Sequence, residues 1–154
     1  MLRILLIGGA SGGHALPLLA VAQEILKESR STNRLVELRF LGVEGGAHAD
    51  FMANNIESRK IISPKWRRYF SVRNFLDLFK LPVTIIQAAF NVWIFMPDLI
   101  FSKGGYDSFF PGLLGRIIFI PLFLHESDSI PGKANLRLAR FAKKIFTSFE
   151  QTNE

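Results

Sequence analysis

Blocks of apolar and polar residues alternate along this chain in a pattern that predicts strands and helices in turn. Leu2–Ile7 is a short, nearly continuous apolar run that ends at two glycines, as is typical of a strand buried on both faces of a parallel sheet. In the range Pro17–Ser29, apolar residues recur at helical spacing, and charged or amide side chains fall on the other side. The sequence therefore opens with a strand followed by a helix.

The same alternation continues beyond residue 30. It predicts further strands at Val36–Leu41, Ile56–Ile62, Asp98–Ser102, Leu122–His125 and Lys144–Ser148. It predicts further helices at Glu44–Asn54, Val72–Phe95, Phe109–Ile117 and Ala134–Ala142, the second of them broken or kinked at Pro82 because proline has no N–H to donate. We therefore predict one α/β domain over residues 1–154 with a doubly wound, Rossmann-like parallel sheet of about six strands and right-handed crossovers.

Ligands of such sheets bind at the carboxyl ends of the strands near the point where the strand order reverses. After the first predicted strand, Gly8–His14 reads GGASGGH. Its glycines allow close approach of the backbone, and the following helix directs free N–H groups toward that space, which suits a diphosphate. The spacing fits neither G-x-G-x-x-G nor a P-loop, which carries a lysine after the last glycine. His14 is either a plain helix-start residue or a group for proton transfer or anion contact.

Two further segments follow predicted strands at the same sheet edge. Ser102–Ser108 again carries glycines that open a helix; Ser108 can cap this helix, and Lys103 is either a cation beside the crevice or a solvent lysine in a turn. The strand before the third segment ends in His125 and Glu126, two titratable groups. Adjacent strand residues point to opposite faces, which disfavours a shared metal. His125 could also be a hydrogen-bonded histidine without a chemical role.

Composition and charge narrow the partners. Cysteine is absent, which excludes disulfides and thiolate chemistry. The net charge of +6 and a pI near 10.0 favour an anionic partner, namely nucleic acid, anionic lipid or a phosphorylated substrate. The most apolar region, Leu81–Phe101, is interrupted by prolines and polar residues, so we predict no transmembrane segment.

Together the three segments resemble the MurG family of glycosyltransferases, and the resemblance covers essentially the whole chain. In that family the first segment reads GGTGGH before a helix containing PALAVA, and here Pro17–Ala22 reads PLLAVA. The second reads GGYVS and is matched by Gly104–Ser108, with Asp107 in place of valine. The third reads HEQN-x-x-x-G-x-x-N and is matched at His125, Glu126, Gly132 and Asn135.

The resemblance implies transfer of N-acetylglucosamine from UDP-N-acetylglucosamine to undecaprenyl-pyrophosphoryl-muramoyl-pentapeptide in peptidoglycan synthesis. The acceptor 4-hydroxyl attacks the donor anomeric carbon with inversion and gives its proton to a base, for which His14 and Glu126 are the two candidates. No metal and no cofactor is implied. The implied substrate contacts are Ser11, Gly12, Gly13, Gly104, Gly105, Tyr106, Ser108, Asp128 and Asn135.

Two further expectations concern these implied contacts, one at Asp128 and one at the glycine segments. Asp128 stands where the family has an asparagine that contacts the nucleotide sugar, and a carboxylate there repels a diphosphate unless it is protonated or paired, for instance with Lys133. At the glycine segments, we expect a bulky side chain at Gly13 or Gly104 to block a diphosphate while the fold survives.

Members of the family carry a second Rossmann-like domain that holds most of the UDP-N-acetylglucosamine site, and this sequence stops just after the sixth predicted strand. We therefore predict an N-terminal acceptor-binding domain of the GT-B type, inactive alone, with weak donor binding. One alternative is a non-catalytic subunit of a split transferase that needs a donor-domain partner. Another is a basic nucleic-acid-binding module, because Lys65–Phe70 interleaves cations with aromatic rings; two glycine turns and a His-Glu segment at one sheet edge argue against nucleic acid.

Basic and aromatic residues cluster between Arg59 and Lys80, where seven basic residues face one acid. This composition predicts peripheral binding to an anionic membrane at its cytoplasmic face. The alternative is that Phe75, Leu76 and Phe79 belong to the core. The residues expected at the lipid surface are Trp66, Arg67, Arg68, Tyr69, Phe70, Phe75 and Phe79.

Overall fold

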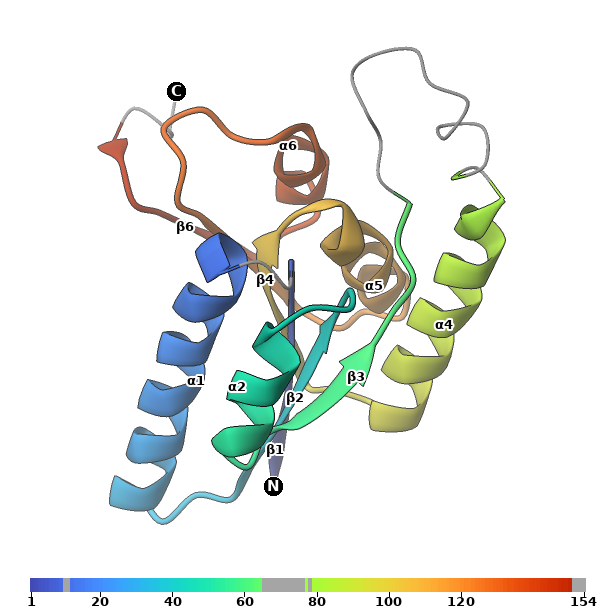
Figure 1. The fold of residues 1–154 in the computed structure, drawn as a ribbon. Coiled ribbons are helices and arrows are strands. Elements are labelled where there is room, and N and C mark those ends of the chain that lie inside the picture. The colour runs from blue at the N-terminus through green and yellow to red at the C-terminus, as the bar shows by residue number, and fades with distance from the viewer. Residues whose placement is uncertain (10–11, 65–76, 78, 151–154) are drawn as a thin grey trace.

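The computed structural model describes residues 1–9, 12–64, 77 and 79–150. Its centre is a six-stranded sheet in the order β3-β2-β1-β4-β5-β6, in which every neighbouring pair is parallel (Figure 1). The strands are β1 (Leu2–Gly8), β2 (Val36–Gly42), β3 (Glu57–Lys60), β4 (Leu99–Gly104), β5 (Leu122–Glu126) and β6 (Lys144–Thr147). The predicted doubly wound α/β fold is confirmed, and its strand order reverses between β1 and β4.

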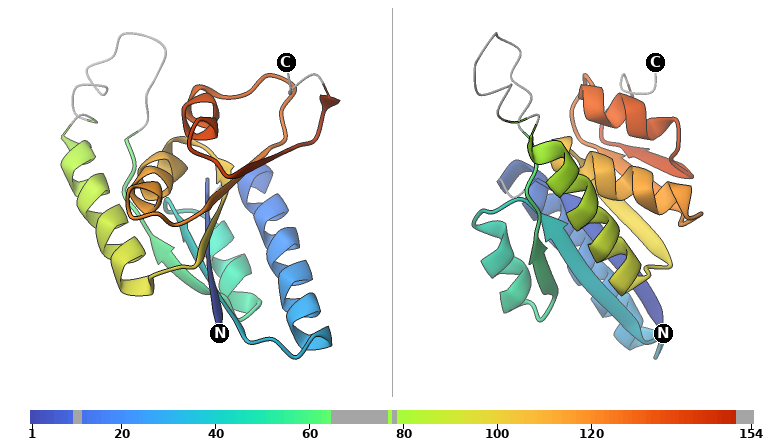
Figure 2. Two further views of the ribbon diagram at one scale, coloured as in Figure 1. Left: turned by 180° about the vertical axis from the view of Figure 1, so that it is seen from behind. Right: turned by 90° about the vertical axis from the view of Figure 1, so that its right-hand side faces the viewer.

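Helices cover both faces of this sheet. They are α1 (Gly12–Ser31), α2 (Ala47–Ala53), α4 (Lys80–Phe95), α5 (Tyr106–Ile117) and α6 (Lys133–Ala139). On one face α1 and α2 pack against alternate residues of the central strands, among them Leu6 and Phe40. On the other face α4, α5 and α6 pack against the residues between them, such as Leu5 and Leu41 (Figure 2). Because β1 is buried on both faces, its nearly continuous apolar run is explained.

Two helices begin earlier than the sequence pattern indicates. α1 starts at Gly12 rather than Pro17, and α5 starts at Tyr106 rather than Phe109. In each helix a proline, Pro17 or Pro111, lies within the helix instead of at its start. Glycine is a poor helix former, so the low helix propensity of Gly12 and Gly13 conceals the first turn of α1 in the sequence. The consequence is that the last residues of the first glycine segment are helical.

The break expected at Pro82 is not found in α4, which is continuous from Lys80 to Phe95. Pro82 lies in the first turn, where the absent N–H has no intrahelical partner to lose. The part of the predicted helix that precedes Asp77 lies outside the described residues. None of the described helices is long and apolar enough to cross a membrane.

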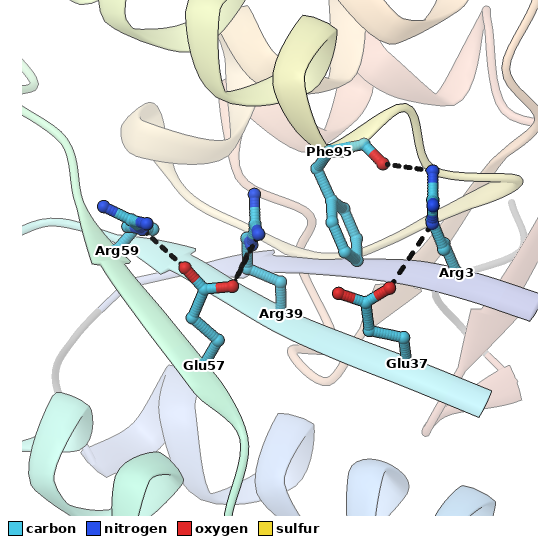
Figure 3. A network of polar contacts seen from close by, with 6 residues as sticks. All are labelled: Arg3, Glu37, Arg39, Glu57, Arg59 and Phe95. Carbon is cyan, nitrogen blue, oxygen red and sulfur yellow. Dashed lines mark hydrogen bonds and ion pairs between the residues drawn. The ribbon is translucent and has the colours of Figure 1, made fainter.

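An ion-pair network ties the end of α4 to the sheet at the edge far from the glycine turns. The guanidinium of Arg39 lies 4.2 Å from the centre of the Phe95 ring and pairs with Glu57, which also accepts a hydrogen bond from Arg59 (Figure 3). Partial burial opposes ionisation of Glu57, but these arginines outweigh it and hold the pKa of Glu57 below its ordinary value. Arg3 donates to the Phe95 carbonyl at 3.4 Å. The end of α4 is therefore fixed on β1, β2 and β3.

Candidate functional site

The two glycine turns meet at the point where the strand order reverses. Gly8 pairs with Gly104 after a register shift at the end of β1. Gly104 and Gly105 have φ angles of +89° and +101°, a region that favours glycine. A Cβ atom on Gly105 would lie 3.9 Å from the backbone nitrogen of Gly9, so the turns lie against each other. The prediction that both turns line one sheet edge is confirmed.

The first turn of α1 lies beside these turns. Gly12, Gly13 and His14 form it, so their backbone N–H groups have no partner within the helix. That turn carries no acidic residue to offset the positive end of the helix dipole. A Cβ atom on Gly13 would meet no atom of the described residues within 4 Å, so these residues leave the space in front of it open. Backbone donors, dipole and open space together suit an anion such as a diphosphate. Ser11 lies outside the described residues.

His14 is held against the first glycine turn. A Cβ atom on Gly9 would lie 3.1 Å from Cδ2 of the His14 ring, so a larger residue at position 9 would push the ring away. The Nδ1 atom of His14 is buried and has no hydrogen-bond partner within the part of the chain that the structure describes. The imidazole is therefore positioned at the first turn of α1, and its Nδ1 atom has no partner among the described residues.

The second glycine turn is shaped by Asn135 of α6. Asn135 is buried, and a Cβ atom on Gly104 would lie 1.9 Å from its Oδ1 atom. A side chain at Gly104 would thus strain the backbone and displace Asn135 in the absence of any ligand. A bulky residue at Gly104 is therefore expected to disturb this turn as well as block a ligand, whereas the surroundings of Gly13 leave space for one among the described residues.

Glu126 organises the third segment. Its Oε1 atom accepts a hydrogen bond from the backbone N–H of Asp128 at 3.0 Å. Its Oε2 atom accepts from the Gly132 N–H at 3.3 Å and from Asn135 Nδ2 at 2.7 Å. The side chain is 4% exposed. Both carboxylate oxygens are therefore committed to holding the 127–132 segment and α6 at the sheet edge.

Lys103 is buried rather than solvent-exposed, which corrects the solvent-lysine alternative. Its side chain is 2% exposed, and its ammonium donates a hydrogen bond to Ser127 Oγ at 2.7 Å. Ser127 in turn donates to Asp128 Oδ1 at 3.3 Å. These two contacts link Lys103, at the end of β4, to Asp128 through Ser127.

The remaining predicted residues differ in their placement. Ser108 does not cap α5: it lies in the first turn, is buried and donates to the Gly104 carbonyl at 2.7 Å, while Gly105 occupies the N-cap position. Tyr106 is half exposed beside the turn. His125 is partly buried, with Nε2 3.3 Å from Ser148 Oγ. Burial and the nearby charge of Lys103 lower the pKa of His125, against the opposite effect of Glu126.

A sequence profile described as the "Glycosyltransferase family 28 N-terminal domain" matches residues 4–147. The chain belongs to this family. It is 35% identical over 151 residues to an enzyme of Treponema pallidum and 37% identical over 152 residues to one of Clostridium novyi. Both are named UDP-N-acetylglucosamine–N-acetylmuramyl-(pentapeptide) pyrophosphoryl-undecaprenol N-acetylglucosamine transferase.

These alignments cover 97% of this chain but only 38% and 41% of the two relatives. Among solved structures, MurG of Acinetobacter baumannii superimposes with a TM-score of 0.82 at 25% identity, over 99% of this chain and 43% of that one. The chain thus spans about two fifths of the length of these glycosyltransferase family 28 relatives.

Sequence reasoning missed one residue at the glycine turns. Asp107, in the first turn of α5, is 7% exposed, and its Oδ1 atom would lie 2.7 Å from a Cβ atom on Gly105. Burial raises the pKa of the Asp107 carboxyl, against the backbone N–H groups of Asp107, Val43 and Ser108 and the charge of His14. The signal available in the sequence was the acid itself, which replaces valine in the family motif.

An exposed apolar surface on α4 and α5 was also missed, because the outer face of α4 reads as part of a core helix. We call it the α4–α5 surface; its residues Phe90, Trp93, Ile117 and Ile118 line a hollow of about 380 Å³ between the two helices. Its strongly exposed members include Trp93 at 68% and Phe119 at 84%. The full set is Ile86, Phe90, Trp93, Ile94, Ile117, Ile118 and Phe119.

Of the residues expected at a lipid surface, those from Trp66 to Phe75 lie outside the described residues. Phe79, at the start of α4, is 65% exposed. The alternative that Phe79 belongs to the core is therefore wrong.

Proposed function

We propose that this chain is the acceptor-binding part of an N-acetylglucosaminyltransferase that uses UDP-N-acetylglucosamine and a lipid-linked pyrophosphoryl muramoyl-pentapeptide. The observation that carries the proposal is the first turn of α1, with its free N–H groups and His14, set against the Gly104–Gly105 turn. This arrangement offers a diphosphate backbone donors and a proton acceptor at one place. The names of the relatives supply the substrate class.

His14 is the better candidate for the base. Both oxygens of Glu126 already accept hydrogen bonds from the third segment and from Asn135. Taking a proton from substrate would require Glu126 to release some of these donors. The His14 ring lies at the anion-binding turn and needs no such rearrangement. In the proposed reaction, His14 takes the proton of the acceptor 4-hydroxyl while the bond from the anomeric carbon to UDP breaks.

In the proposed complex the backbone donors and the dipole of α1 stabilise the diphosphate of the acceptor, and the leaving UDP is held mainly by the donor-binding domain. In this complex, the acceptor occupies the open space before Gly13 and contacts Tyr106. Asp128 and Asn135 lie nearer the nucleotide. Because the carboxylate of Asp128 is linked through Ser127 to buried Lys103, part of its repulsion toward a diphosphate is offset.

A transfer assay tests the proposal. Labelled UDP-N-acetylglucosamine is supplied with a pyrophosphoryl-linked muramoyl-pentapeptide to this chain alone, to the chain mixed with the carboxyl-terminal part of the Clostridium novyi relative, and to a fusion of the two. We expect product from the fusion and little from the chain alone. Activity of the mixture would favour the split-transferase alternative. Tight stoichiometric binding of UDP-N-acetylglucosamine to the chain alone, measured by calorimetry, would contradict the placement of the donor site in another domain.

We also propose that the α4–α5 surface, with Phe79, binds the face of an anionic membrane. Trp93 and Phe90 are strongly exposed, and a second hollow beside Phe119 is lined by Arg116, Arg140 and Lys143. Apolar side chains next to cations are typical of an element that lies in the lipid interface. Such attachment would hold the domain at the membrane that carries a lipid-linked acceptor.

Replacing Phe90 and Trp93 together by serine is expected to weaken binding to phosphatidylglycerol-containing vesicles by about tenfold or more, because each buried aromatic side chain contributes about 1.5–3 kcal/mol. Sedimentation of vesicles measures this, and binding should fall as salt is raised. Met52→Ser on α2 is the control, since Met52 is 64% exposed on the opposite face. Equal binding to neutral and anionic vesicles, or binding to neither, would contradict the proposal. Saturable binding of a labelled single-stranded oligonucleotide would instead support the alternative that the chain is a nucleic-acid-binding module.

A further inference from the structure

One buried acid at the glycine turns has no part in the mechanism given above. Asp107 is the second residue of α5 and is 7% exposed. Its Oδ1 atom folds back over Gly105, and its Oδ2 atom is buried without a hydrogen-bond partner among the described residues. An unpaired buried carboxylate oxygen is costly, so its retention needs a reason.

His14 packs against the same place from the other side. The His14 ring lies beside the Cβ position of Gly9, and the Asp107 carboxylate lies beside the Cβ position of Gly105, which is itself 3.9 Å from the backbone nitrogen of Gly9. The Nδ1 atom of His14 is likewise buried and unpartnered within the described ranges. Beside these two glycines lie an imidazole nitrogen of His14 and a carboxylate oxygen of Asp107, each without a hydrogen-bond partner among the described residues. The two groups are complementary, because a protonated ring nitrogen donates and a carboxylate oxygen accepts.

We infer that Asp107 is a positioning residue for His14: in the working enzyme the Nδ1–H of His14 donates to the Asp107 carboxylate, after a side-chain adjustment, because the structure leaves both atoms unpaired among the described residues. A proton on Nδ1 leaves the lone pair on Nε2, which then takes the proton of the acceptor hydroxyl as the new glycosidic bond forms. The carboxylate stays ionised throughout and stabilises the imidazolium that results. The inference rests on the proposed role of His14 as the base.

The cost of Asp107 to folding agrees with a functional role. Burial raises the pKa of the Asp107 carboxyl in the folded state, so the folded protein holds this proton more tightly than the unfolded chain. The contribution of Asp107 to stability is therefore present at low pH and is lost as the pH rises through the raised pKa. Once ionised, the acid opposes folding. Asp107→Asn should accordingly unfold at the same or a higher urea concentration than the unchanged chain.

The tautomer of His14 tests the inference on the chain itself. The ¹⁵N shifts of the ring nitrogens are measured at a pH of about 8.5, where histidine rings are largely neutral. We expect the Nδ1–H form to predominate in the unchanged chain and the Nε2–H form to predominate in Asp107→Val. Asp50→Asn, an exposed acid on α2, is the control and should leave the tautomer as it is. The same tautomer in the unchanged chain and in Asp107→Val would overturn the inference.

A second measurement does not need the Asp107→Val variant and so remains possible if that variant fails to fold. The side-chain carboxyl of Asp107 is titrated by ¹³C NMR in the unchanged chain and in His14→Gln. Because the charge of His14 lowers the pKa of Asp107, removing it should move the midpoint upward. An unmoved midpoint would overturn the inference. Both measurements are made without substrate, so a negative result contradicts only the inference about Asp107. The proposed function is tested separately by kcat.

Discussion

Alanine at position 14 is expected to lower kcat by about 10²–10⁴-fold in the fusion that carries a donor domain, the range typical of a lost general base. The acceptor hydroxyl would then have to give its proton to water. The backbone donors of α1 do not depend on the imidazole, so diphosphate binding and the acceptor KM should change much less than kcat. Steady-state kinetics with the acceptor varied at saturating UDP-N-acetylglucosamine measures both constants.

The matched control for this substitution is Leu16→Ala, because Leu16 lies on the same part of α1 and is 58% exposed. It alters the helix without touching the glycine turns and should retain kcat. A His14→Ala enzyme with unchanged kcat would move the role of base to Glu126. If KM rises and kcat/KM falls by the same factor while kcat is preserved, His14 is an anion contact instead.

Glu126→Ala is expected to lower the free energy of unfolding by about 3–5 kcal/mol. The substitution removes the acceptor of hydrogen bonds from Asp128, Gly132 and Asn135, and a buried donor left without a partner costs about 1–3 kcal/mol. Asn135 in turn packs on Gly104, so the second glycine turn should loosen as well. Urea unfolding followed by circular dichroism measures the change.

Glu37→Ala provides the comparison for that experiment. Glu37 pairs with Arg3 on the surface, with both side chains about two fifths exposed, and an exposed pair of this kind contributes at most about 1 kcal/mol. Should Glu126→Ala also cost less than about 1 kcal/mol, the carboxylate would not be the anchor described above and would be available for chemistry.

The sheet and the placement of the glycine turns were predictable because they depend on patterns with a direct physical cause. β1 is buried on both faces, and its apolar run shows this in the sequence. The carboxyl ends of β1, β4 and β5 lie side by side in the sheet, which follows from the alternation of strands and helices. Where propensity and packing disagree, as at Gly12 and Tyr106, the sequence placed the start of the helix too late.

The chemistry of single side chains was less predictable, because burial depends on neighbours far away in the sequence. Lys103 follows a strand and reads as a turn lysine, yet Ser127 accepts its hydrogen bond inside the molecule. Glu126 reads as a titratable group at a sheet edge, yet its partners include Asn135, nine residues later. Asp107 gave a signal only as an acid in place of valine, and its position beside Gly105 required the fold.

The attachment of α4 through Arg39 bears on how salt experiments are read. Cations around the α4–α5 surface, such as Arg116, face solvent, so added salt screens them over a distance of about 8 Å at physiological ionic strength. Arg39, at 9% exposed between the Phe95 ring and Glu57, is shielded from that screening. Raising the ionic strength therefore removes the attraction of the helix for lipid headgroups and leaves its attachment to the sheet in place. A loss of vesicle binding in high salt would thus report on the membrane contact and not on detachment of α4 from the domain.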